Sequence, residues 1–321
     1  MRVPFPAQQD GTVYLTEGGQ ETEIMYKFGY DLPHFVMFQL LDDPKATAEL
    51  RGMYQRYLDT VARHGFSALM GGLDYRASPD WAQLLGYSAE GLAEMQHRSI
   101  AFLRDVAQPY VGQIEQIRIA GIVGPRGDAY ALNRDITANE AQEYHSVQLE
   151  TLKAANVDLA SAMTFNSVAE AVGVSRAAAG VGLPISVAFT LDGTHRLQSG
   201  PSLKEAVLAV DTEAGDDRPD LYGINCSHPY EFDPALEPGD WIQRVRSLRP
   251  NAAAMEKVAL CTLGHLEEGD PAQLGVLAGA LARRFPHIDV WGGCCGTWET
   301  HLVEIARNVA AARRDQAPAV A

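Results

Sequence analysis

The chain has 321 residues, 46% of them hydrophobic and 21% charged, a composition typical of globular proteins with a sizeable core. The net charge of −15, from 26 basic and 41 acidic residues, argues against nucleic acid or an anionic membrane as a partner, because both require a basic face. No stretch approaches the roughly 20 apolar residues of a membrane span, and residues 1–6 lack the apolar core of a signal peptide. We therefore expect a cytoplasmic protein whose cysteines remain thiols.

Eight short apolar runs alternate with helical patterns along the chain. The predicted strands are residues 13–16, 66–71, 117–123, 157–165, 185–191, 221–226, 252–259 and 288–293. Apolar residues at three- and four-residue spacing predict helices at residues 50–61, 89–106, 139–155, 167–179, 202–210, 234–248, 271–285 and 299–311. The seventh run is the weakest strand, because it is rich in alanine and carries charges. Strands that alternate with helices indicate a parallel sheet.

Eight strand–helix units match the count of a (β/α)8 TIM barrel, an α/β fold whose catalytic groups lie at the carboxyl ends of the strands. An open doubly wound sheet also alternates strands and helices, but it need not bring the ends of its sixth and eighth strands together. The barrel is therefore the preferred fold. We predict one barrel domain over residues 1–312 and a disordered tail at residues 313–321.

Three of the four cysteines lie at strand ends in segments flanked by glycine. Cys226 ends the sixth predicted strand, and Cys294 and Cys295 directly follow the eighth. Zn²⁺ prefers sulfur and nitrogen ligands, and a catalytic zinc site keeps three protein ligands and one open position, where a substrate thiol is deprotonated. The alternatives are a strained disulfide between the adjacent pair and inert buried thiols, the interpretation preferred for Cys261. Spacing alone leaves them open, because no close CxxC pairs occur.

Other residues near strand ends carry weaker signals. His228 is a zinc ligand, a general base or a turn residue before proline, and the turn is the favoured interpretation. Arg126 is a candidate for binding a substrate carboxylate, and the ring of Trp298 either packs or faces a cationic donor. No GxGxxG or GxxxxGK[ST] loop occurs, so nucleotide cofactors bound by such loops are not expected.

With these residues identified, the chain resembles the homocysteine S-methyltransferase family over almost its full length. That family comprises zinc-dependent enzymes, among them betaine–homocysteine methyltransferase and the substrate domain of cobalamin-dependent methionine synthase. The most specific matches are Gly223-Ile224-Asn225-Cys226 and Gly292-Gly293-Cys294-Cys295-Gly296-Thr297. Weaker matches are the loop that begins Glu17-Gly18 and the loop Gly121-Ile122-Val123-Gly124-Pro125. The resemblance implies a barrel in which Cys226, Cys294 and Cys295 hold Zn²⁺ and an acceptor thiolate takes the fourth position.

The departures from the family pattern concern the substrate. Met163 stands where the family usually has a glutamate that holds the amino group of homocysteine, and Glu21 stands where it has glycine. The family motif after the second strand reads Gly72-Leu73-Asp74-Tyr75, and the motif after the seventh is matched to residues 260–264. A replacement carboxylate is expected from Asp74, Glu17 or Glu21; otherwise the acceptor lacks an α-amino group. The predicted substrate-binding residues are Glu17, Gly18, Asp74, Tyr75 and Asn225.

These observations predict a zinc-dependent S-methyltransferase that moves a methyl group from a sulfonium or quaternary ammonium donor to a thiol, with homocysteine as acceptor and methionine as product. The first alternative is the same transfer with another thiol or donor. A hydrolase or lyase on the same barrel is disfavoured, because three thiolate ligands acidify zinc-bound water poorly. A zinc-storage protein is disfavoured because structural zinc sites have four protein ligands. The expected partners are a small-molecule thiol and a methyl donor; the sequence does not give the oligomeric state.

Overall fold

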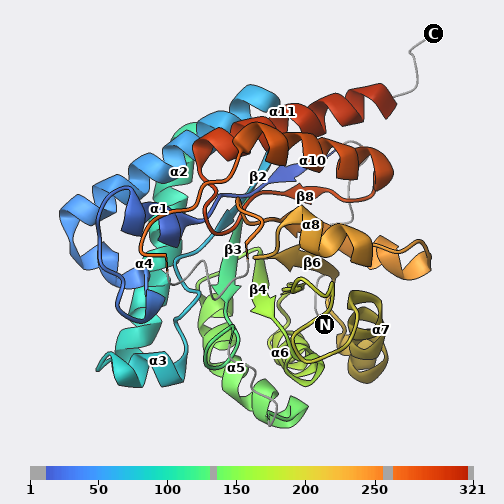
Figure 1. The fold of residues 1–321 in the computed structure, drawn as a ribbon. Helices are drawn as coiled ribbons and strands as arrows, with labels where there is room; N and C mark the ends of the chain where they lie inside the picture. Colours follow the sequence, from blue (N-terminus) through green and yellow to red (C-terminus); the bar gives the residue numbers. More distant parts are fainter. Residues whose placement is uncertain (1–11, 131–135, 256–262, 317–321) are drawn as a thin grey trace.

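A computed structural model describes residues 12–130, 136–255 and 263–316. Eight parallel strands pair in chain order and β8 pairs with β1, so the sheet closes into the predicted (β/α)8 TIM barrel (Figure 1). The strands are β1 (Tyr14–Leu15), β2 (Ser67–Gly71), β3 (Ile117–Val123), β4 (Leu159–Phe165), β5 (Ile185–Phe189), β6 (Leu221–Asn225), β7 (Val245–Arg249) and β8 (Val290–Trp291).

Helices form a ring outside the strands (Figure 1). They are α1 (Gln20–Tyr26), α2 (Pro44–His64), α3 (Pro79–Leu84), α4 (Ala89–Ala107), α5 (Ala138–Ala154), α6 (Val168–Gly180), α7 (Leu203–Ala214), α8 (Pro229–Phe232), α10 (Pro271–Arg284) and α11 (Glu299–Gln316). Several begin where the sequence offers a cap. Thr137 with Glu140 forms a capping box before α5, and the Asp270 side chain accepts from the first turn of α10. None of the helices within the described ranges is long and apolar enough to cross a membrane.

The core has two layers because neighbouring strand residues point to opposite faces of the sheet. Leu15 belongs to the large cluster between strands and helices, whereas Tyr14 belongs to a smaller cluster inside the barrel. The smaller cluster consists of Tyr14, Leu69, Ala120, Ile122, Leu159, Met163, Leu221 and Val290. These side chains fill the barrel, so it is a packed core rather than a pore. Any chemistry must therefore take place at its mouth.

The seventh strand was placed wrongly from the sequence. β7 covers Val245–Arg249, inside the segment predicted to be helical, and short 3-10 turns precede it. Residues 252–255 form no strand, and residues 256–259 lie outside the described residues. The apolar signal of β7 is hidden because only Val245 and Leu248 are hydrophobic, while Arg246 and Arg249 are ion-paired. Because their charges are paired, these arginines are tolerated in a barrel strand, although the hydropathy of the segment does not predict a strand.

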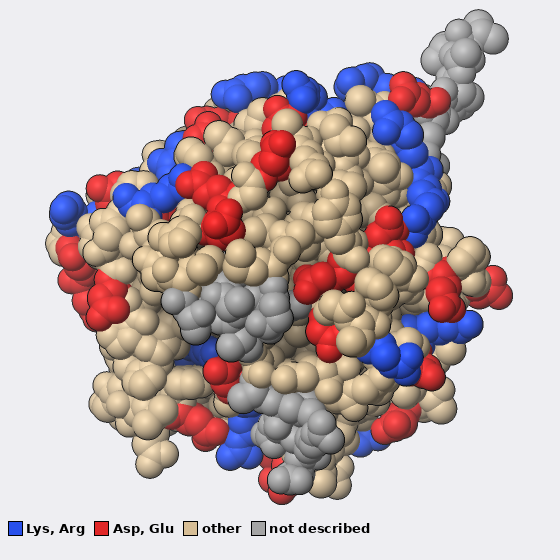
Figure 2. All heavy atoms as spheres, viewed as in Figure 1, with Lys and Arg blue, Asp and Glu red and all other residues tan. Residues whose placement is uncertain are grey.

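The carboxyl terminus of the barrel is also more ordered than predicted. Helix α11 extends to Gln316, so residues 313–316 of the predicted tail are helical, and residues 317–321 lie outside the described residues. Arg313 explains the extension, because its guanidinium donates hydrogen bonds to the carbonyl groups of Pro286 and Ile288. On the face drawn in Figure 2, basic and acidic side chains lie along the upper and right-hand edges, with uncharged residues between them.

Candidate active site

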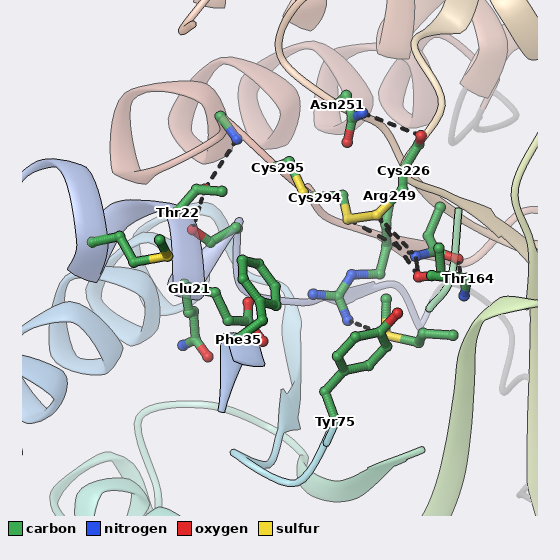
Figure 3. A pocket seen from close by; sticks show the side chains of 18 of the residues that line it. Glu21, Thr22, Phe35, Tyr75, Thr164, Cys226, Arg249, Asn251, Cys294 and Cys295 are labelled. Carbon is green, nitrogen blue, oxygen red and sulfur yellow. Dashed lines mark hydrogen bonds between the residues drawn. A yellow bond between two sulfur atoms is a disulfide. The ribbon is translucent and has the colours of Figure 1, made fainter. Parts of the chain in front are cut away.

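The three cysteines predicted to bind zinc meet at the carboxyl end of the barrel (Figure 3). Cys226 follows β6, Cys294 and Cys295 follow β8, and the three sulfur atoms lie within 4.8 Å of one another. The structure joins Cys226 and Cys294 in a disulfide in which Cys295 takes no part. The expectation that all three are thiols is therefore not met in this structure, and the joined pair is not the adjacent pair. Cys261 lies outside the described residues.

Hydrogen-bond donors surround the sulfur atoms. The Asn225 side-chain amide lies 3.3 Å from Cys226 Sγ and 3.8 Å from Cys294 Sγ, and the Thr164 hydroxyl lies 3.8 Å from Cys226 Sγ. Asn225 also accepts from the Thr164 backbone and donates to its hydroxyl, both at 2.8 Å. Thr164 and Cys226 have positive φ angles of 65° and 53°, a strained conformation that this network holds in place. Donors aimed at sulfur favour the thiolate form that binds a metal.

The glycines around the cysteine pair allow two backbones to approach closely. The Gly19 amide donates to the Thr297 carbonyl at 2.9 Å, and the Gly293 amide donates to the Glu17 carbonyl at 3.2 Å. A Cβ atom at Gly19 would collide with the Cys294 carbonyl. Backbone contacts therefore join the loop after β1 to the loop after β8. These contacts hold the cysteine pair against residues 17–19.

A cavity of about 320 Å³ opens beside the cysteines. Four of the five predicted substrate-binding residues line it: Glu17, Gly18, Tyr75 and Asn225. Asp74 is not among the lining residues. It is fully buried, its carboxyl lies against Gly72, and burial raises its pKa to about 7. Asp74 thus lies beside the site without facing it.

An ion pair that the sequence analysis missed forms the floor of the cavity. Arg249 donates to Glu17 Oε1 at 2.7 Å and to the Gly293 carbonyl at 3.2 Å, and its Nη1 lies 3.4 Å from the sulfur of Met163. Glu17 Oε2 accepts from the Gly71 amide at 2.9 Å, so both carboxylate oxygens are occupied. In Figure 3 the guanidinium lies between the cysteine cluster and Tyr75.

Arg249 was missed because the seventh strand was misplaced. With β7 ending at Arg249, the segment that follows the seventh strand is Pro250-Asn251-Ala252. The family motif after the seventh strand is Tyr-Pro-Asn-Ser-Gly, matched above to residues 260–264. It belongs instead at residues 249–253, where arginine replaces tyrosine. The Pro-Asn pair was the signal that would have found it. Asn251 supports the site, because its side chain donates to the Cys226 carbonyl at 3.1 Å.

The opposite side of the cavity comes from α1, the 3-10 turn Pro33–Phe35 and the loop after β2. Glu21 and Phe35 lie on this side in Figure 3, facing the side of Thr164 and Cys226. Tyr75 lines the same cavity, and burial raises the pKa of its hydroxyl to about 12, so it is protonated at neutral pH. Arg76 stacks on Tyr75, with the guanidinium carbon 5.1 Å from the ring centre.

The three weaker sequence candidates have structural roles. His228 caps α8, accepting from the Tyr230 amide, and burial lowers its pKa to about 4. Arg126 pairs with Asp80 at 2.9 Å. The ring of Trp298 is covered by the Lys27 ammonium, 3.3 Å from the ring centre. None of the three candidates is among the described residues that line the cavity, so none belongs to this site.

Comparison with known proteins agrees with this geometry. The sequence model of the homocysteine S-methyltransferase family matches residues 14–309. Methionine synthase from Mycobacterium leprae (strain TN) is 30% identical over 138 residues, which is 41% of this chain but only 10% of that protein. The homocysteine methyltransferase MmuM from Escherichia coli, in a metallated form, has a TM-score of 0.70 at 20% identity over 94% of this chain and 96% of its own. Its oxidized form gives the same values, and its apo form gives a TM-score of 0.67 at 19% identity over 95% and 100%.

The solved structures show the shared barrel fold, and the sequence model covers nearly all of that barrel in this chain. The two specific cysteine motifs lie within the matched residues and come together in space. The chain therefore belongs to the homocysteine S-methyltransferase family.

Proposed function

We propose that this protein is a zinc-dependent enzyme that transfers a methyl group from a sulfonium or quaternary ammonium donor to homocysteine and so forms methionine. The observation that carries the proposal is the gathering of three cysteine sulfurs within 4.8 Å, from two separate strand ends, beside a cavity of about 320 Å³. Membership of the family supports homocysteine as the acceptor. A cysteine site that must stay reduced also supports a cytoplasmic location.

The residues present fit zinc. Cys226, Cys294 and Cys295 supply three sulfur ligands, which leaves one tetrahedral position for a substrate. Zn²⁺ bound by these residues would lower the pKa of an acceptor thiol and hold its sulfur in place. Because thiolates are the metal ligands, the Cys226–Cys294 disulfide has to be reduced before metal binds.

The chain's own residues then position two reactants. The acceptor thiol loses its proton, its sulfur forms a bond to the donor methyl carbon, and the bond from that carbon to the donor sulfur or nitrogen breaks. The bonding electrons stay on the donor atom, which becomes neutral. Met25, Phe35 and Tyr75 give the cavity apolar and aromatic walls. Such walls hold a cationic group weakly hydrated, which favours a step in which the positive charge disappears.

Metal analysis combined with a donor screen tests the proposal. After reduction and zinc loading, the protein should retain about one zinc per chain and convert homocysteine to methionine with at least one sulfonium or quaternary ammonium donor. Mass spectrometry of the product identifies both the acceptor and the methyl transfer. A reduced protein that retains no zinc, or one that methylates no thiol with any donor of these two classes, would refute the proposal.

A further inference from the structure

The floor of the cavity is unsuited to an ammonium group. Met163 offers a thioether sulfur there, and the Arg249 guanidinium lies 3.4 Å from that sulfur. An α-ammonium group placed beside Met163 would meet a like charge and no carboxylate with a free oxygen. An amino-acid thiol such as homocysteine therefore needs its ammonium partner elsewhere in the cavity.

Two of the three carboxylates considered from the sequence are unsuited to this role. Glu17 is only 4% exposed, pairs with Arg249, and accepts hydrogen bonds on both oxygens. Asp74 is fully buried and does not line the cavity. Two further acidic residues line it, but Asp128 is exposed and already accepts from the Tyr130 amide, and Glu267 is 38% exposed at 3.7 Å from His265.

Glu21 is the remaining carboxylate. It lines the cavity from α1, on the side opposite Cys226 and Thr164 (Figure 3). Within the described part of the chain, no side chain of another residue donates a hydrogen bond to it. Burial raises the pKa of Glu21, while the positive charges of Arg249 and Arg76 lower it. A half-buried carboxylate held near cations but bonded to neither can gain a direct ionic partner.

We propose that Glu21 binds the α-ammonium group of the acceptor and thereby makes this enzyme selective for an amino-acid thiol. The inference rests on the proposed function for its choice of acceptor. It moves the ammonium site from the β4 end, where Met163 lies, to α1 on the other side of the mouth. Glu21 is thus a specificity residue, not a participant in bond making.

Binding of two thiols, measured calorimetrically on reduced, zinc-loaded protein without donor, tests the inference. L-homocysteine is compared with 4-mercaptobutyrate, which lacks only the amino group. We expect Glu21→Gln to weaken homocysteine binding about 10- to 100-fold and to leave the analogue unchanged, because one charged hydrogen bond is lost. Glu21→Asp keeps the charge and should retain part of the selectivity.

Glu23→Gln is the matched control. Glu23 lies on the same helix, but it pairs with Arg56 at 2.7 Å and does not line this cavity, so its loss should leave both affinities unchanged. The inference is overturned if Glu21→Gln weakens the binding of both thiols equally or changes the binding of neither. It is also overturned if the wild-type protein prefers 4-mercaptobutyrate.

Turnover is scored separately from binding, so the two proposals can fail independently. Selective homocysteine binding through Glu21 without methyl transfer would refute the proposed function and support this inference. Methyl transfer to homocysteine, with a selectivity between the two thiols that Glu21→Gln does not change, would support the proposed function and refute this inference.

Discussion

The two sides of the barrel mouth are built differently. The cysteine side comes from the ends of β6 and β8, where short side chains and glycines are fixed by backbone hydrogen bonds and by Asn225. It agrees with both cysteine motifs of the family. The other side and the floor carry long charged side chains, Glu21, Arg76 and Arg249, and two of these stand where the family pattern has other residues. The difference supports the proposal that this protein uses the family's cysteine site and recognises the rest of its substrate with other residues.

The largest expected effect comes from the cysteine side. Replacing Cys226, Cys294 or Cys295 by alanine should abolish both zinc retention and methyl transfer, because each removes one of three ligands. Cys261→Ala should keep both. Metal content by atomic absorption and methionine formation are the measurements. If any of the three variants kept its zinc while Cys261→Ala lost it, the assignment of the zinc ligands to the ends of β6 and β8 would be wrong.

The next effect concerns the floor. Arg249→Met should destabilise the reduced, zinc-free protein by about 3–5 kcal/mol, because it leaves the buried Glu17 carboxylate unpaired. The double variant with Glu17→Gln should recover much of this loss. Urea unfolding measures both. Arg51→Met is the control, since its partner Asp105 is 67% exposed and the change should cost less than about 1 kcal/mol. If Arg249→Met and Arg51→Met destabilised the protein by equally small amounts, the interpretation of Arg249 and Glu17 as a buried ion pair would be contradicted.

Asp74 gives a pH-dependent effect. Its pKa is about 7 in the folded protein and about 3.9 in the unfolded chain, so the folded state holds the proton more tightly and stability falls as pH rises from about 4 to 7. Asp74→Asn removes this loss. Its stability relative to wild type should be about 2–3 kcal/mol more favourable at pH 8 than at pH 5 in urea unfolding.

Homocysteine binding by the same variant separates Asp74 from the recognition side. The affinity should be unchanged, because the carboxyl does not reach the cavity. A tenfold or larger loss would make Asp74, rather than Glu21, the ammonium partner.

The smallest effect is on zinc affinity. Asn225→Ala should weaken zinc binding about 10- to 100-fold, because it removes donors to two sulfur atoms. Thr164→Val removes the 3.8 Å contact to Cys226 and the hydroxyl that accepts from Asn225, but it leaves both amide contacts to sulfur in place and should cost less. Competition with a chelator gives both dissociation constants. A larger loss for Thr164→Val would show that the strained turn at β4, not the amide donors, controls the thiolates.

The fold was predictable because seven of its strands are apolar runs bounded by turn residues, and their number matches a closed barrel. The structure confirms the barrel. β7 could not be found in the same way, since Arg246 and Arg249 are tolerated only through Asp289 and Glu17, which lie 43 and 232 residues away in sequence. A hydropathy pattern counts each arginine as polar, and it contains no information about the carboxylate that pairs with it in the folded protein.

Some residues of the site could likewise be predicted from local motifs, and others could not. Cys226, Cys294 and Cys295 were found because their chemistry is specific and their motifs are local. The burial of Asp74 and the engagement of Glu17 were not predictable, because both depend on which way a side chain turns after a strand ends. Residue type predicted that a carboxylate was needed, and only the geometry distinguished one carboxylate from another.

The contact between Gly19 and Cys294 has a consequence for the order of folding. The pairing of β1 with β8 joins segments that are nearly the whole chain apart, which is the slowest kind of contact to form. The same pairing brings the cysteine pair against the start of α1, whereas Cys226 and the cysteine pair come together through β7, which pairs with both β6 and β8. The three sulfur atoms can thus be assembled by the last three strands alone, while the wall that α1 gives to the cavity is added only when β1 and β8 close the barrel.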